Sequence, residues 1–185
     1  MIITIFGMPG SGKTTVGKML AKKLGYRFYS MGDMRGRMAM ERGLTIDQLN
    51  RLGESEDWTD KDVDKYQEEL GKKEDNFIVD GWLSWHFIPH SLKVFLEVDH
   101  RTAAERVFRD QRPDEKKQDT VEGMKRMLEE RLEESNARYR KYYGIIDITD
   151  RSHYDLVIDT NDISAKQVAA RILEAVGKRM KPRPE

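Results

Sequence analysis

The sequence predicts an α/β fold in three layers, α/β/α, built on a parallel sheet of five strands, and three observations carry this prediction. Short apolar or β-branched runs alternate with longer amphipathic segments, the order expected for a parallel sheet covered by helices. A glycine-rich turn, residues 7–15, separates the first apolar run from the first amphipathic segment. The chain has 185 residues, of which 38% are hydrophobic, enough for one domain around a single core.

Five segments are expected to form the strands: residues 2–6, 27–30, 76–80, 91–98 and 154–159. The first is β-branched and apolar along its length, as in a strand buried on both faces. In parallel α/β sheets, ligands bind beyond the carboxyl ends of the strands. The glycine-rich turn, Ser30, Asp80 and Asp159 are therefore expected to share one functional edge of the sheet.

The first helix should follow the glycine-rich turn and end at Gly25, a residue suited to a C-cap. Its apolar positions recur at helical spacing, at Val16, Met19, Leu20 and Leu24.

The later helices are expected in three regions. Residues 31–73 are polar and helical, with a capping box that begins at Thr45. Helical sequence resumes near Thr102, breaks at 112–118, and continues from Thr120 until Gly144. A last amphipathic helix follows Ser164. We expect a single domain over 1–185, with a core of residues 1–30, 74–110 and 120–180, an insertion at 31–73 and a lid at 111–119.

Composition argues against several classes of function. The 33 basic and 33 acidic residues balance to a formal net charge of zero, which gives no general field for nucleic acid or membrane. There is no cysteine, and the amino terminus runs directly into the first strand without a signal segment. We expect a cytoplasmic, monomeric protein with neither a nucleic-acid nor a membrane partner.

The glycine-rich turn, Gly7-Met8-Pro9-Gly10-Ser11-Gly12-Lys13-Thr14-Thr15, matches the phosphate-binding P-loop, or Walker A, pattern. Backbone N–H groups of such a turn, with the amino terminus of the next helix, bind phosphate oxygens. An ordinary glycine turn is the alternative, but the strand before it and the helix after it favour the P-loop. The sequence predicts binding of ATP through Gly7, Gly10, Ser11, Gly12, Lys13, Thr14 and Thr15.

Two residues are expected to hold the Mg²⁺ ion that accompanies ATP. Thr14 offers a hydroxyl directly after the P-loop lysine. Asp80 ends an apolar strand, where P-loop enzymes keep a metal-holding carboxylate. A strand-ending aspartate can also serve turn formation alone. Beside a P-loop, the metal role is favoured for Thr14 and Asp80.

Spaced arginines suggest phosphoryl transfer, since guanidinium groups stabilise the charge on a phosphoryl group in transit. Arg106 and Arg109 lie one helical turn apart, and Arg131 and Arg138 lie two turns apart on one helix face. Surface salt bridges are the alternative for any single arginine. A lid that closes over the phosphates and excludes water explains the set together. The expected catalytic residues are Lys13, Arg106, Arg109, Arg131 and Arg138.

The chain resembles the nucleoside monophosphate kinases, and among them the short cytidylate kinases of archaea and some bacteria. The resemblance covers almost the whole length and rests on residues 7–15, Ser30-Met31-Gly32-Asp33, Glu41-Arg42-Gly43-Leu44, Asp80-Gly81 with Leu83-Ser84, Arg106, Arg109, Arg131 with Ser135 and Arg138, and Tyr142-Tyr143-Gly144-Ile145. It implies a P-loop NTPase kinase fold in which residues 31–73 bind the monophosphate. It also implies transfer from MgATP to CMP or dCMP, with Arg131 and Arg138 clamping the phosphates and Arg106 and Arg109 on the ATP side.

The implied acceptor site departs from the family pattern at two positions. Gly36 and Trp82 stand where family members usually carry arginines, so Arg35 or Arg37 is expected to substitute and Trp82 could stack on a base. Asp64 and Gln67 are candidates for reading the base edge, with a solvated helix face as the alternative. The full acceptor set is Ser30, Gly32, Asp33, Arg35, Arg37, Asp64, Gln67, Asp80, Gly81, Trp82 and Ser135.

Three alternatives stay open at the level of sequence. One is an adenylate or uridylate kinase, and another is a shikimate or gluconate kinase of the same architecture. The third belongs to a different class, a nucleotide-dependent switch that hydrolyses ATP slowly and signals through a partner. The long helical insertion favours a nucleotide acceptor, and the lid arginines favour transfer over switching.

Overall fold

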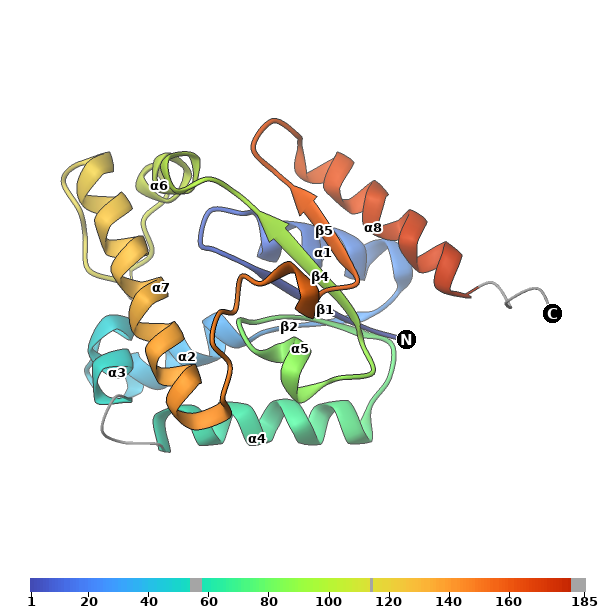
Figure 1. Ribbon diagram of the computed structural model, residues 1–185, viewed down its shortest axis with the longest axis horizontal. Helices are drawn as coiled ribbons and strands as arrows, with labels where there is room; N and C mark the ends of the chain where they lie inside the picture. Colours follow the sequence, from blue (N-terminus) through green and yellow to red (C-terminus); the bar gives the residue numbers. More distant parts are fainter. Residues whose placement is uncertain (54–57, 114, 181–185) are drawn as a thin grey trace.

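A computed structural model describes residues 1–53, 58–113 and 115–180 of the chain. Its centre is a sheet of five parallel strands in the order β2-β3-β1-β4-β5 (Figure 1). The strands are β1 (Ile2–Gly7), β2 (Arg27–Ser30), β3 (Phe77–Asp80), β4 (Leu92–Glu97) and β5 (Leu156–Asp159). The predicted fold class and the position of each strand are confirmed, with ends that differ by one or two residues.

Eight α-helices surround the sheet in the part of the chain that is described. They are α1 (Lys13–Leu24), α2 (Met31–Glu41), α3 (Ile46–Leu52), α4 (Trp58–Lys73), α5 (Ser84–Phe87), α6 (His100–Arg109), α7 (Val121–Tyr143) and α8 (Ala165–Met180), with a 3₁₀ turn at Arg151–His153. None of these helices is both long enough and apolar enough to cross a bilayer.

Alternating side chains of the sheet pack on its two faces, which gives the three layers. Ile3 and Ile5 of β1 pack with α1 and α8 on one face. Ile2 and Phe6 point to the other face, where Ile2 packs with α2 and α4 and Phe6 packs with α5 and the end of α7. Because β1 is buried on both sides, it reads as a continuous apolar run in the sequence.

Most predicted helix ends are confirmed by their capping contacts. Gly25 and Gly144 end α1 and α7 in the left-handed region, with φ of 69° and 70°. Thr45 and Gln48 form the expected capping box of α3. The prediction that helical sequence resumes near Thr102 was two residues late, because the Asp99 carboxylate accepts hydrogen bonds from two backbone N–H groups and starts α6 at His100.

The register of the strands brings Asp80 and Ser30 together at the edge of the sheet where the functional site was expected. Ile5 of β1 pairs with Asp80 of β3, and Ser30 of β2 pairs with the same Asp80. The helices α2, α3 and α4 lie on one side of this edge (Figure 1), and the long α7 contacts α3 and the residue after it through Arg138 and Tyr142. The sheet edge, these helices and the connection from α6 to α7 therefore surround one region.

Candidate active site

The glycine-rich turn joins β1 to α1, and its glycines are required by its shape. Gly10 and Gly12 have φ of 84° and 85°, a region that other residues rarely adopt. A Cβ atom on Gly10 would come within 2.6 Å of the Ala103 carbonyl oxygen, so this loop lies directly against α6. The first turn of α1 carries no acidic residue. Its amino terminus therefore keeps the positive potential that attracts phosphate.

Lys13, Thr14 and Asp80 meet where β1 and β3 end. The Thr14 hydroxyl donates a hydrogen bond of 2.5 Å to Asp80 Oδ2, and Asp80 is only 1% exposed. Loss of hydration lowers the pKa of the Lys13 ammonium, while the neighbouring Asp80 carboxylate opposes that shift and Arg131 adds to it. Lys13 is thus a partly desolvated cation held between groups of both signs.

The oxygens of Thr14 and Asp80 suit Mg²⁺. This ion prefers hydroxyl and carboxylate oxygens and keeps several waters, so one or two protein ligands beside a bound phosphate are sufficient. Within residues 1–53, 58–113 and 115–180, no group of three or more His, Cys, Asp or Glu side chains could hold a metal by itself. The donor set therefore fits an ion delivered with a nucleotide, and the metal role of both residues stays a prediction.

A cleft of about 450 Å³ opens at this edge, within the range of small-molecule sites. The predicted residues that line it are Gly10, Gly12, Lys13, Thr14, Thr15, Ser30, Gly32, Arg35, Asp64, Gln67, Asp80, Gly81, Trp82, Arg106, Arg131, Ser135 and Arg138. Gly7, the last residue of β1, and Ser11 of the loop are buried and are not part of its lining. Asp33, Arg37 and Arg109 are not part of its lining.

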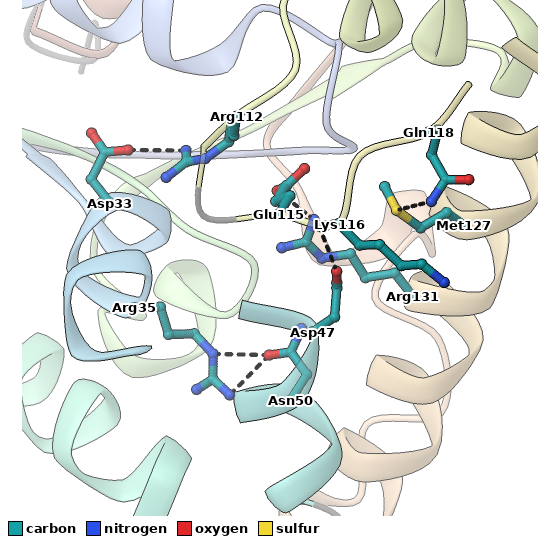
Figure 2. A network of polar contacts seen from close by, with 10 residues as sticks. All are labelled: Asp33, Arg35, Asp47, Asn50, Arg112, Glu115, Lys116, Gln118, Met127 and Arg131. Carbon is teal, nitrogen blue, oxygen red and sulfur yellow. Dashed lines mark hydrogen bonds and ion pairs between the residues drawn. The ribbon is translucent and has the colours of Figure 1, made fainter. Parts of the chain in front are cut away.

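Arg35 is the arginine of α2 that faces the cleft. Its guanidinium donates to Asn50 Oδ1 through Nε at 3.1 Å and Nη2 at 3.0 Å (Figure 2). Its Nη1 donates to the Thr59 carbonyl at 2.8 Å. These contacts tie α2 to α3 and α4. Arg37 is exposed. Of the two substitutes expected for the family's missing arginine, Arg35 therefore has the suitable position.

Two arginines of α7 enter the cleft from the opposite wall. Arg131 forms an ion pair of 2.8 Å with Glu115, with side chains only 11% and 7% exposed. Arg138 is 4% exposed and reaches the Asn50 carbonyl and the Ser135 hydroxyl, both at 3.5 Å. Ser135 is itself buried, so it supports Arg138 from within the helix. The spacing predicted from the sequence brings all three residues to one surface.

The connection from α6 to α7 contacts the helices across the cleft. Arg112 forms an ion pair of 3.0 Å with Asp33 of α2 (Figure 2). The backbone N–H of Lys116 donates to Asp47 Oδ2 of α3 at 3.4 Å (Figure 2). Asp33, expected at the acceptor, is thus bound by this predicted lid, whose residue 114 lies outside the described residues.

Arg106 has a different setting from the one expected. Its Nη1 donates to the Gly10 carbonyl at 3.1 Å, and Nη2 donates to the carbonyls of Thr160 and Asn161, both at 2.9 Å. The guanidinium therefore fastens the P-loop to the segment after β5. Arg109, one turn further along α6, is exposed. A direct role of either arginine at the phosphates stays a prediction.

Sequence reasoning missed Asn50 and Glu115. Asn50 is buried one turn after Ile46 in α3, and a polar residue on the apolar face of a capped helix is a signal that could have identified it. Glu115 stands in a charged stretch that gives no periodic signal. Its pairing with Arg131 depends on the path of the α6–α7 connection.

Together, the fold and the cleft define a P-loop protein with arginines facing its phosphate loop, the arrangement of a phosphoryl-transfer enzyme. The family model described as the cytidylate kinase-like family matches residues 2–162. The chain belongs to this family, as the sequence resemblance predicted.

Curated relatives are similar in sequence to this protein over nearly its whole chain. A cytidylate kinase of Methanocella arvoryzae is 40% identical over 177 residues, 95% of this chain and 97% of that protein. One from Archaeoglobus fulgidus is 37% identical over 177 residues, 95% of this chain and 94% of that protein. Among solved structures, a shikimate kinase from Acinetobacter baumannii in complex with shikimate superposes with a TM-score of 0.63 at 22% identity, covering 98% of this chain and 95% of that chain. At that identity the likeness concerns the fold alone.

Proposed function

We propose that this protein is an ATP-dependent cytidylate kinase, which transfers the γ-phosphoryl group of ATP to CMP or dCMP and releases ADP with CDP or dCDP. One observation carries the proposal. A single cleft is lined by the P-loop residues Lys13 and Thr14 and by three arginines, Arg35 of α2 and Arg131 and Arg138 of α7. A P-loop alone explains triphosphate binding, whereas facing arginines supply a place for a second phosphorylated ligand. The cytidylate kinases among its relatives support CMP as the acceptor.

The chemistry would need no covalent intermediate. Phosphoryl transfer depends on alignment of the two substrates and on neutralising charge at the transferred group. Lys13 would contact the phosphate chain of ATP as a partly desolvated cation, where its charge acts more strongly than in water. Arg131 and Arg138 would orient the acceptor phosphate, with Arg35 on the opposite wall.

Mg²⁺ would arrive with ATP, and Thr14 and Asp80 would hold it. When bound, the ion neutralises charge on the phosphate oxygens. The hydroxyl of Thr14 donates to Asp80, which keeps both oxygens together at the end of the P-loop. This preorganisation spares a rearrangement when the metal–nucleotide complex binds.

The lid would favour transfer of the phosphoryl group to the acceptor over hydrolysis of ATP. Residues 111–119 contact α2 and α3 through the Arg112–Asp33 ion pair and the Lys116–Asp47 hydrogen bond. Arg112 and Glu115 of this segment line the cleft, so the lid would help to exclude water from the phosphates. We include in this proposal the division into core, insertion 31–73 and lid, and action as a monomer. We also include a cytoplasmic location, with which the lack of cysteine is compatible.

An assay of ADP release over a panel of acceptors tests the proposal. CMP and dCMP should give the highest kcat/KM, with UMP and AMP weaker and shikimate inactive. The Lys13→Ala variant is the control for contaminating kinases. ADP release that ignores the acceptor would instead favour the nucleotide switch, and a preference for shikimate would favour the kinases that share only the fold.

A further inference from the structure

Four polar side chains form a hydrogen-bonded row across three helices beside the cleft. Tyr143, the last residue of α7, donates its hydroxyl to Asp64 Oδ2. Gln67 Nε2, one turn along α4, donates to Asp64 Oδ1 at 3.5 Å. The Ser84 hydroxyl at the start of α5 donates to Gln67 Oε1 at 2.5 Å. Each helix therefore contributes to one continuous row.

The direction of every bond in this row is set by chemistry. An ionised carboxylate only accepts hydrogen bonds, so both Tyr143 and Gln67 must donate to Asp64. The amide of Gln67 then has its nitrogen toward Asp64 and its oxygen toward Ser84, which must donate. Gln67 is 3% exposed and Ser84 is not exposed at all, so water is poorly placed to replace either partner. Ser84 thereby opposes rotation of the Gln67 amide.

Only the middle of the row reaches the ligand space. Asp64 and Gln67 line the cleft, whereas Tyr143 and Ser84 stand behind them and are not part of its lining. We propose that Tyr143 and Ser84 are positioning residues that hold Asp64 and Gln67 as a fixed acceptor–donor pair for the Watson–Crick edge of a cytosine. This inference rests on the proposed function and explains how the acceptor site selects its base.

Cytosine presents an amino donor at N4 beside an acceptor at N3, whereas uracil presents an acceptor at O4 beside a donor at N3. Asp64 would accept from the N4 amino group, and the second N–H of the Gln67 amide would donate to N3. Uracil would place an oxygen against the carboxylate and an N–H against the amide N–H, a mismatch at both positions. A site with buried polar groups rejects the analogue that leaves them unpaired. The row therefore predicts selection of cytosine over uracil.

The pair alone does not distinguish cytosine from adenine, because adenine also presents an amino donor beside a ring nitrogen acceptor. Rejection of a purine would depend on the space in the cleft. The row's specific signature is thus the ratio of kcat/KM for CMP to that for UMP. Substitution of Ser84 or Tyr143 should change this ratio, although neither residue takes part in the chemical step.

The experiment measures kcat and KM for CMP and UMP with the unmodified protein, Asp64→Asn, Ser84→Ala and Tyr143→Phe. Asp64→Asn should lower the CMP:UMP ratio of kcat/KM by about 100-fold, because its amide can donate to O4 of uracil. Ser84→Ala and Tyr143→Phe should each lower the ratio by about 10-fold, chiefly by raising KM for CMP, with kcat at saturating CMP within about twofold. Ser84→Ala removes only a hydroxyl from a tightly packed position.

Tyr142→Phe is the matched control. It removes the neighbouring hydroxyl, which donates to the Gly53 carbonyl at 3.1 Å and does not belong to the row. Its CMP:UMP ratio should equal that of the unmodified protein. If Ser84→Ala and Tyr143→Phe lower kcat for both nucleotides equally and keep the ratio, the row has a structural role only and the inference is wrong. If the unmodified protein phosphorylates neither nucleotide, the proposed function itself fails and this inference falls with it.

Discussion

Arg106 offers a sharp test, because its predicted role and its observed contacts differ. The sequence favours a catalytic arginine on the ATP side, whereas the guanidinium is engaged by the backbone carbonyls of Gly10, Thr160 and Asn161. Replacing it in Arg106→Met keeps much of the aliphatic packing and removes all three hydrogen bonds. Hydrogen bonds from a charged group contribute about 1.5 to 3 kcal/mol each, with less where water can replace them.

Arg106 is half-buried, so we expect partial rehydration and a total loss of about 3 kcal/mol in the free energy of unfolding. For a domain of this size, each 1 kcal/mol shifts Tm by about 2 to 4 °C, which gives a fall of about 6 to 12 °C. Thermal and urea denaturation of the nucleotide-free protein measure the effect. KM for ATP should rise as well, because the Gly10 carbonyl anchors the P-loop.

Arg109→Met is the matched control, since Arg109 is exposed on the same helix and does not line the cleft. Its free energy of unfolding should stay within about 0.5 kcal/mol of the unmodified protein. The reasoning would be refuted if Arg106→Met were as stable as the unmodified protein yet lost its activity. That result would place the guanidinium on the phosphates and make the carbonyl contacts incidental.

Three further outcomes follow from the same geometry. Lys13→Met should abolish ADP release. Because desolvation lowers the pKa of Lys13 in the folded protein, the unfolded chain binds this proton more tightly, so the free energy of unfolding of the unmodified protein should rise relative to that of the variant as the pH approaches 10.5. Parallel curves of unfolding free energy against pH, measured by urea unfolding, would contradict this. Glu115→Gln should lower the free energy of unfolding by about 3 kcal/mol, because it leaves Arg131, whose side chain is only 11% exposed, without its counter-charge. An unchanged urea midpoint would count against this. Gly10→Ala should weaken ATP binding at least about tenfold, because residue 10 has a left-handed conformation and the added Cβ would lie 2.6 Å from the Ala103 carbonyl oxygen. Unaltered binding in a nucleotide titration would show that the P-loop does not need glycine at this position.

The parts of this site that the sequence predicted are those set by local geometry. The P-loop glycines are recognisable because the left-handed φ values at Gly10 and Gly12 restrict the residue type. Asp80 is recognisable because it ends a strand at a known edge. Arg131 and Arg138 come together because two helical turns separate them. Each of these predictions needs only one turn, strand or helix and the spacing of the residues along it.

The contacts that the sequence did not predict join distant elements. The charge of Arg106 was noted, but its acceptors lie in the P-loop and after β5, which only the packed fold brings together. Glu115 reaches Arg131 through an irregular connection with no period to follow. The row through Asp64 needed three helices to be placed before its outer members could be recognised.

Direct transfer between two nucleotides is the central claim, and isotope tracing tests it most directly. With ATP labelled at the γ-phosphoryl group, CMP and Mg²⁺, label should appear in CDP in a one-to-one ratio with ADP, with little inorganic phosphate. Lys13→Met should show neither product. Label that appears as inorganic phosphate at the same rate with and without CMP would contradict the account, because the cleft would then activate water rather than a second nucleotide.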